Sequence, residues 1–183
     1  IEDNAIYLNN SKLIFEAKNG STIQVEDKID GTNYQTYIIG DNNSKFVLNN
    51  NIKNSNIELY DTNFYLGNKD NVLDGNNLTL NSGSFNMINN QAGVSSLNKL
   101  TILGNTNFTA DVDLKNKEMD RFSASEYGEH TGTLNVVGMN LLSDAKKDKT
   151  EIYFAEKGLK DHVAGEITLP QSAHQTTLFS PIY

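Results

Sequence analysis

Two aspartates with i, i+2 spacing are the residues in this chain best suited by type to acid–base chemistry. Asp111 and Asp113 alternate with apolar residues, which would place both carboxylates on one face of a β-strand. Glycosidases and polysaccharide-cleaving β-helices use such carboxylate pairs. An enzyme of that kind would also show basic residues grouped in one strand register, and the lysines do not (Lys12, Lys45 and Lys99). We therefore expect a solvated outer face, no catalytic residue and no enzyme activity.

Three histidines could in principle bind a metal or transfer a proton: His130, His162 and His174. Each lies in a polar, turn-like stretch, and none has a further ligating residue at a suitable offset beyond the adjacent Glu129 and Asp161. We predict that the histidines are exposed. The acidic loops lack the Gly-Gly-x-Gly-x-Asp repeat of calcium-binding coils (Asp41, Asp70 and Asp74). The sequence thus predicts no metal site and no cofactor.

Composition excludes several classes of function. The 183 residues carry a net charge of -8, and nucleic-acid binding requires a basic face. There are no cysteines, hence no disulfides or thiolate sites, and no Gly-x-Ser-x-Gly or phosphate-binding loop. No apolar run is long enough for a membrane-spanning helix. The start, Ile1-Glu2-Asp3, resembles neither a signal peptide nor an initiator, so we expect a fragment or processed product.

The elements that would position these residues repeat along the chain. Apolar pairs with i, i+2 spacing recur 21 to 23 residues apart in two parallel series, Ile57/Leu59, Leu78/Leu80, Leu100/Ile102 and Phe64/Leu66, Phe85/Met87, Phe108/Ala110. Each pair predicts a short strand with one buried face. All 27 asparagines lie at or before Asn140, many of them in turn-rich stretches between the pairs. Coils of about 21 residues can bury their apolar faces only by stacking.

This pattern predicts an all-β fold, a parallel β-helix. Further pairs upstream extend it with irregular spacing (Leu13/Phe15, Ile23/Val25 and Phe46/Leu48). A β-sandwich has no fixed period near 21 residues, and a leucine-rich repeat needs a leucine consensus that is missing here. The only helical candidate, around residues 145–149, is better interpreted as a charged loop.

Composition changes near residue 116, where asparagine becomes rare and longer strands are predicted, at residues 133–137 and 150–155. Terminal units of repeat proteins are atypical because they cover the open end of the core. We therefore divide the chain into Asn-rich coils, residues 1–115, and a C-terminal capping region, residues 116–183.

The C-terminal region resembles the segment of bacterial autotransporter passengers that precedes the membrane barrel. The residues that carry this resemblance are Asp111-Val112-Asp113-Leu114, Met119-Asp120-Arg121-Phe122, Gly132-Thr133-Leu134-Asn135-Val136, Met139-Asn140-Leu141-Leu142 and Glu151-Ile152-Tyr153-Phe154-Ala155. The Asn-rich coils resemble the β-helices of the same family. The resemblance implies a right-handed β-helix, secreted to the Gram-negative cell surface, with an autochaperone-like end. Its partner would be its own outer-membrane barrel, which this chain does not contain.

These expectations favour a non-catalytic stalk that displays an N-terminal part of the passenger and whose C-terminal region supports folding during outer-membrane translocation. One alternative is an adhesin module that contacts host or sibling cells. Another is a carbohydrate-active β-helix, favoured only by tyrosines expected to be exposed (Tyr34, Tyr37 and Tyr65). The sequence does not choose a ligand.

Overall fold

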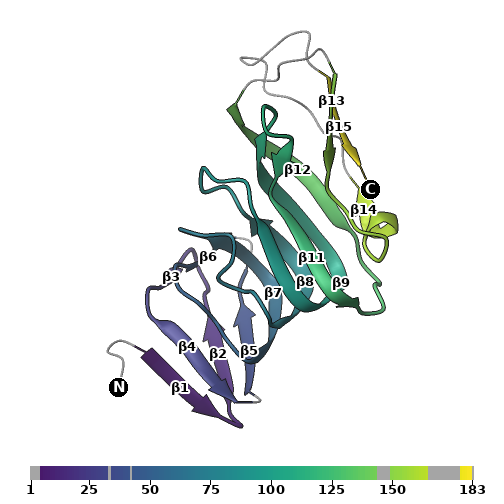
Figure 1. Cartoon of the computed structure of the whole chain (residues 1–183). Coiled ribbons are helices and arrows are strands. Elements are labelled where there is room, and N and C mark those ends of the chain that lie inside the picture. The colour runs from purple at the N-terminus through teal and green to yellow at the C-terminus, as the bar shows by residue number, and fades with distance from the viewer. Residues whose placement is uncertain (1–4, 33, 42, 144–148, 165–177, 183) are drawn as a thin grey trace.

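The computed structural model describes residues 5–32, 34–41, 43–143, 149–164 and 178–182. Its strands stack along one axis as a β-solenoid of about five turns, with the N-terminal and C-terminal coils at opposite ends (Figure 1). Successive coils pair through parallel strands. The parallel β-helix predicted from the repeat is therefore confirmed.

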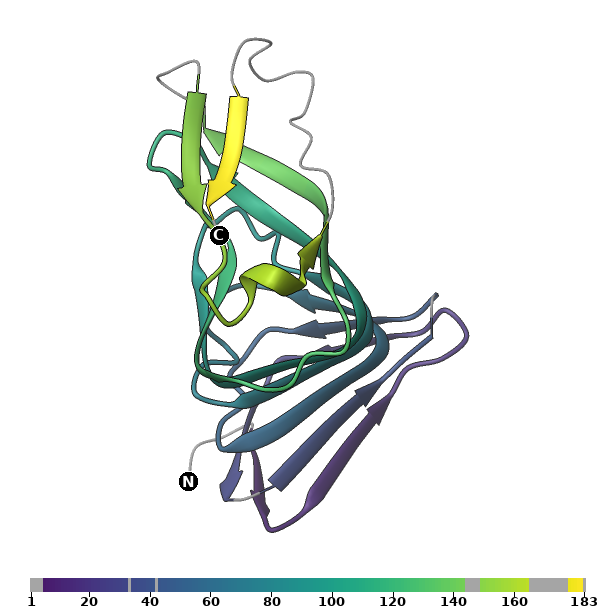
Figure 2. The same ribbon diagram turned by 90° about the vertical axis from the view of Figure 1, so that its right-hand side faces the viewer.

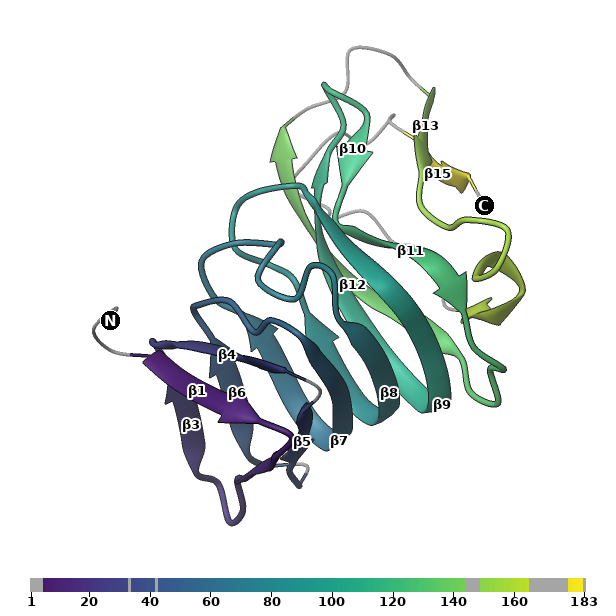
Figure 3. The same ribbon diagram turned by 60° about the horizontal axis from the view of Figure 1, so that its bottom comes forward.

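The first two coils have three short strands each. These are β1 (Ala5–Asn9), β2 (Lys12–Glu16) and β3 (Thr22–Val25), which pair in parallel with β4 (Lys28–Thr32), β5 (Tyr34–Ile39) and β6 (Lys45–Leu48). Figure 3 shows these coils at the N-terminal end. The irregularly spaced upstream pairs thus lie on strands as predicted. Their side chains at the outer rung are only partly buried (Leu8, Leu13, Phe15 and Ile23).

Later coils use longer strands, which are β7 (Ser55–Leu66), β8 (Asn77–Asn86) and β9 (Val94–Asp113). In β7 the buried positions run Ser55, Ile57, Leu59 and then skip to Thr62, because Asp61 has φ 51° and turns the strand around a corner. Gly83 turns the corner of β8 with φ 99°, and a Cβ there would lie 2.3 Å from a Thr62 backbone oxygen. Glycine is therefore required where two corners stack.

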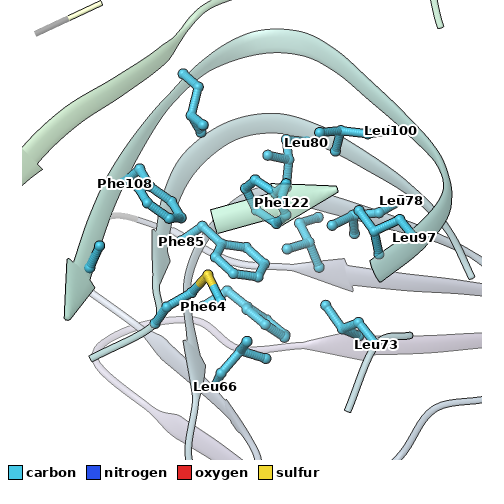
Figure 4. Close-up of a cluster of buried hydrophobic side chains, with 14 of the residues drawn as sticks. Phe64, Leu66, Leu73, Leu78, Leu80, Phe85, Leu97, Leu100, Phe108 and Phe122 are labelled. Atoms are coloured by element: carbon cyan, nitrogen blue, oxygen red, sulfur yellow. The ribbon is translucent and has the colours of Figure 1, made fainter. Parts of the chain in front are cut away.

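The core consists of columns of similar apolar side chains. Ile57, Leu78 and Leu100 occupy one register column, and Phe64, Phe85 and Phe108 occupy another, as the repeat predicts. The Phe64–Phe85 and Phe85–Phe108 ring centroids are 5.0 and 6.3 Å apart. Figure 4 shows these rings in the interior, facing Leu78 and Leu100. Stacking buries each apolar face, which no single coil could do.

One further coil follows residue 116. A hairpin leads from β9 to β10 (Glu118–Met119), and β11 (Arg121–Tyr127) and β12 (Leu134–Ser143) then pair in parallel with the two halves of β9. The register offset is 27 residues at Leu100↔Tyr127 and 28 at Phe108↔Val136. The solenoid thus continues across the composition change with a longer coil, and the domain boundary at residue 116 stays a prediction.

The end of the last coil is covered by β13 (Lys149–Tyr153), η1 (Lys160–His162) and β14 (Val163–Ala164), while β15 (Leu178–Ile182) pairs with β13. Figure 2 shows η1 and β14 lying across the end of the solenoid. We call residues 152–164 the cap. Four of its apolar side chains are buried (Ile152, Phe154, Ala155 and Leu159). Most of the predicted charged loop at 145–149 lies outside the described residues.

Candidate functional site

A cluster of three aspartates is buried at one corner of the solenoid. Asp70 follows β7, Asp111 lies on β9 and Asp120 joins β10 to β11, and their exposed fractions are 7%, 0% and 0%. Asn89, from the loop after β8, connects two of them, because its side chain donates to Asp70 and its backbone N–H donates to Asp111. The cluster therefore links successive coils along the solenoid axis.

The carboxylates of this cluster accept hydrogen bonds from backbone N–H groups of the corner. Asp111 Oδ2 accepts from the N–H groups of Asn89 at 2.7 Å and Gln91 at 3.2 Å. Asp120 accepts from the N–H groups of Gly93 at 2.9 Å and Asp111 at 2.7 Å. These carboxylates accept the hydrogen bonds that carbonyl groups of a neighbouring strand accept elsewhere in the sheet. Without them the buried N–H groups would be left unpaired, which is energetically costly.

The electrostatics of the cluster differ from those of surface aspartates. Burial, and after it the negative charge of Asp70, raise the pKa of Asp120 to about 9, while the backbone N–H groups of Asp111 and Gly93 oppose the shift. Burial also raises the pKa of Asp70. At neutral pH Asp120 therefore holds a proton and is hydrogen bonded to Asp70, as two close carboxyl groups cannot both ionise cheaply.

The prediction that Asp111 and Asp113 lie on a solvated outer face is wrong for Asp111. That side chain is fully buried, and Asn140 donates to its second oxygen at 2.8 Å. Asp113 points instead into the β9–β10 hairpin, where Asn116 and Ser143 donate to it and, although burial opposes the shift, hold its pKa below the ordinary value. The two carboxylates do not form a pair open to a substrate. The alternation itself holds, since Val112 is buried in the core, but Asn89 and Gln91 of the loop after β8 and Asn140 of β12 cover the outer side of the strand at Asp111.

The structure also corrects the prediction that the histidines are exposed. His130 and His162 are both partly buried, and their ring centroids lie 4.7 Å apart. Burial and the neighbouring His162 lower the pKa of His130. The two histidines are 32 positions apart in the sequence, so local spacing does not reveal the pair. His174 lies outside the described residues.

A polar groove of about 310 Å³ crosses the outer face of β5, β7, β8 and β9. A ladder of asparagine side chains lies along it, in which Asn77 donates to Asn56 and Asn98 donates to Asn77, each at 2.7 Å. Each amide has two donor hydrogens and two acceptor lone pairs, so the ladder leaves groups free for an outside partner. The groove also carries hydroxyl, aromatic and charged side chains (Tyr37, Glu58, Thr79, Lys99 and Thr101).

Of the three tyrosines expected to be exposed, Tyr34 is fully buried, and its hydroxyl donates to the Ile29 carbonyl. Tyr37 and Tyr65 are partly exposed, and lysines of the preceding rung lie over their rings, Lys12 at 5.5 Å and Lys45 at 5.4 Å. These cation–π contacts connect neighbouring coils. Only Tyr37 lines the groove.

Within the described residues, no group of three or more His, Cys, Asp or Glu side chains is arranged to hold a metal ion. The same residues include no helix long and apolar enough to cross a membrane. Comparison with known proteins gives no assignment, because no family model, no curated protein and no solved structure matches the chain.

Proposed function

We propose that the chain is a non-catalytic stalk segment of a secreted autotransporter passenger at the Gram-negative cell surface, whose C-terminal region supports stacking of the coils during translocation. The observation that carries this proposal is the cover over the C-terminal end of the core. Cap residues Phe154 and Leu159 are fully buried there, so the last coil does not leave its apolar face open to water.

The position of β9 supports a templating role for the C-terminal region. β9 spans 20 residues and pairs with β8 on one side and with β11 and β12 on the other, while β10 pairs with its last two residues beyond the end of β8. Once the last coil and the cap have covered one side of β9, its opposite edge offers a preformed register to β8. Each added coil then offers the same register to the next, as in other one-dimensional repeat folds.

Two truncations test the proposed role of the C-terminal region. A fragment ending at Leu114 loses β10, β11, β12 and the cap, so Phe108 and its neighbours meet water, and we expect poor folding. A fragment lacking residues 1–40 loses only coils whose outer rung is partly buried, and should keep its strand content. Circular dichroism and limited proteolysis measure both. A 1–114 fragment with full strand content would contradict the proposal.

The polar groove favours an adhesin module as a second candidate. Free amide groups beside the Tyr37 ring suit hydrogen bonding and stacking with a glycan. Glycan-array binding that is lost in Asn77→Ala and kept in Asn86→Ala, an asparagine on the other half of β8, would support this candidate.

The carbohydrate-active alternative is tested separately, with acidic polysaccharides as substrates. We expect no turnover, because a substrate cannot reach the buried Asp111 carboxylate. Turnover that disappears in Asp111→Asn while the variant keeps its native strand content would overturn the non-catalytic proposal.

A further inference from the structure

The contact between the cap and the last coil includes a backbone hydrogen bond that ends on an imidazole. In the loop between β11 and β12, the N–H groups of Thr131 and Gly132 both donate to the Ile102 carbonyl. The Ile102 N–H donates to His130 Nδ1 at 2.9 Å. The His130 side chain thus replaces the backbone carbonyl that a regular rung would supply to Ile102.

His130 lies between the solenoid and the cap. On the cap side, the His162 ring of η1 meets it edge-on, with an interplanar angle of 70°. On the solenoid side, the Tyr127 ring lies 6.0 Å away, and its hydroxyl donates to Glu156 of the cap at 2.6 Å. Gly158 of the cap rests directly on the Tyr127 ring, where a Cβ would come within 2.2 Å.

The hydrogen bond from Ile102 fixes the tautomer of His130. Because Nδ1 accepts, the proton of the neutral ring is on Nε2, which is buried and faces the Gly158 backbone of the cap. A neutral ring in this tautomer presents no lone pair from Nε2, so this arrangement does not suit a metal ion. A second proton would go to Nδ1 and would face the Ile102 N–H, donor against donor.

We infer that the contact between His130 and the cap is an acid-sensitive latch, which holds the cap on the last coil while the His130 ring is neutral and releases it when that ring is protonated. Protonation has two unfavourable effects. The Ile102 hydrogen bond is lost, and a positive charge is placed on a partly buried ring that packs against His162. The latch is independent of the role proposed for the C-terminal region in folding.

Among the residues that the structure describes, the charged groups around the latch do not supply a counterion for a protonated His130 ring. Glu156 is already bound by Ser123, Ala124 and Tyr127. Glu126 is ion-paired with Lys99 at 3.7 Å. The remaining nearby charges are exposed and of both signs (Glu129, Lys157, Lys160 and Asp161).

The direction of the pH effect follows from the burial of His130. Its pKa in the folded chain lies below the ordinary value of 6.5, whereas the released ring has the ordinary value. Above pH 6.5 both states are neutral and the cap is fully held. As the pH falls below 6.5, the released state takes up protons first, so the cap loses stability until the pH passes the folded pKa.

Hydrogen exchange measured by mass spectrometry on the whole chain tests the latch. Exchange rates, corrected for the intrinsic effect of pH, are compared at pH 7.5 and 5.0. We expect peptides covering 152–164 and Ile102 to exchange at least about tenfold faster at the lower pH, and peptides from β7 and β8 to stay unchanged. No selective change in the cap would overturn the inference.

Two variants separate the latch from a general effect of acid. In His130→Asn the amide oxygen can accept the Ile102 N–H but cannot be protonated, so the cap should stay protected at pH 5.0. In His162→Phe the ring contact remains but the electrostatic effect of His162 on the pKa of His130 is removed, so the response should be smaller. If His130→Asn opens at pH 5.0 like the unmodified chain, the latch is wrong. NMR titration of His130 gives an independent readout, and a midpoint at or above 6.5 would also refute it.

Discussion

Asp70 and Asp120 share a proton, and this pair makes the folding stability of the chain depend on pH in the neutral-to-alkaline range. The pKa of Asp120 is about 9 in the folded chain against an ordinary value of 3.8. The folded chain therefore keeps a proton that the unfolded chain releases, and this stabilisation is full below pH 4 and is lost as the pH rises through about 9. We expect the free energy of unfolding, measured with urea, to fall between pH 6 and pH 9.

Asp70→Asn should reduce that fall. The variant removes the charge that opposes ionisation of Asp120, while its amide oxygen can still accept from Asn89. Asp113→Asn is the matched control, because Asp113 lies outside the cluster and its pKa is lowered. It should leave the dependence between pH 6 and 9 unchanged. An equal slope in Asp70→Asn and the unmodified chain would contradict the assignment of the proton to this pair.

The phenylalanine column predicts a graded effect of truncation. Phe85 is fully buried and contacts the rings of Phe64, Phe108 and Phe122, so Phe85→Ala should cost about 3–5 kcal/mol. Phe15 belongs to the outer rung, is partly buried and contacts only Phe46 among the described rings. Phe15→Ala should cost clearly less in the same urea denaturation. Equal costs would mean that the outer rung is as well covered as the centre.

At the scale of elements, the packing of the cap against the last coil requires glycine at position 158, where there is no room for a side chain. Gly158→Ala would drive a methyl group into the Tyr127 ring, and overpacking of this kind costs about 1–3 kcal/mol. We expect proteolysis within 152–164 to accelerate while β7 and β8 stay protected. Gly75→Ala is not a suitable control because φ there is +80°. Gly138, whose Cβ would lie 3.1 Å from the Thr109 methyl group, is a milder comparison at a strand position.

The strands of the central coils were predictable because their signal is local. Pairs such as Ile57/Leu59 and Phe64/Leu66 report one buried face each, and their spacing reports the register. The corners were not predictable, because Asp61 and Ser82 adopt positive φ that their residue types do not demand. These corners decide where the alternation of buried positions shifts, as it does between Leu59 and Thr62.

The candidate sites depend on contacts between distant positions. Asp70 and Asp120 are separated by 50 residues, and His130 and His162 by 32. No local pattern marks either pair, and the lengthened coil of 27 to 28 residues shifts the register on which an extrapolated repeat would rely. Asp120 stood out in the sequence only as part of the stretch that carries the family resemblance, which gives no reason for its burial.

For the whole molecule, stability should increase from the first coil towards the last. β1 to β3 pair on one side only within the described residues, whereas β9 pairs on both sides and lies under the cap. We expect backbone hydrogen exchange to be slowest in β9, β11 and β12 and fastest in β1 to β5. Exchange measured at pH 7.5 by mass spectrometry gives the order. Equal protection along the chain would indicate that the coils unfold as a single unit.

The covered C-terminal end also restricts how copies of this chain could polymerise. Growth of a fibre by strand addition needs a receptive edge at both ends of each subunit. Here the Ala124 N–H is taken by Glu156, and Leu134 and Asn135 are taken by β14, so one end presents an interrupted edge. Within the described residues, β1 to β3 at the other end pair on one side only. A fold whose stacked strands resemble those of a cross-β fibril thus blocks strand addition at its C-terminal end.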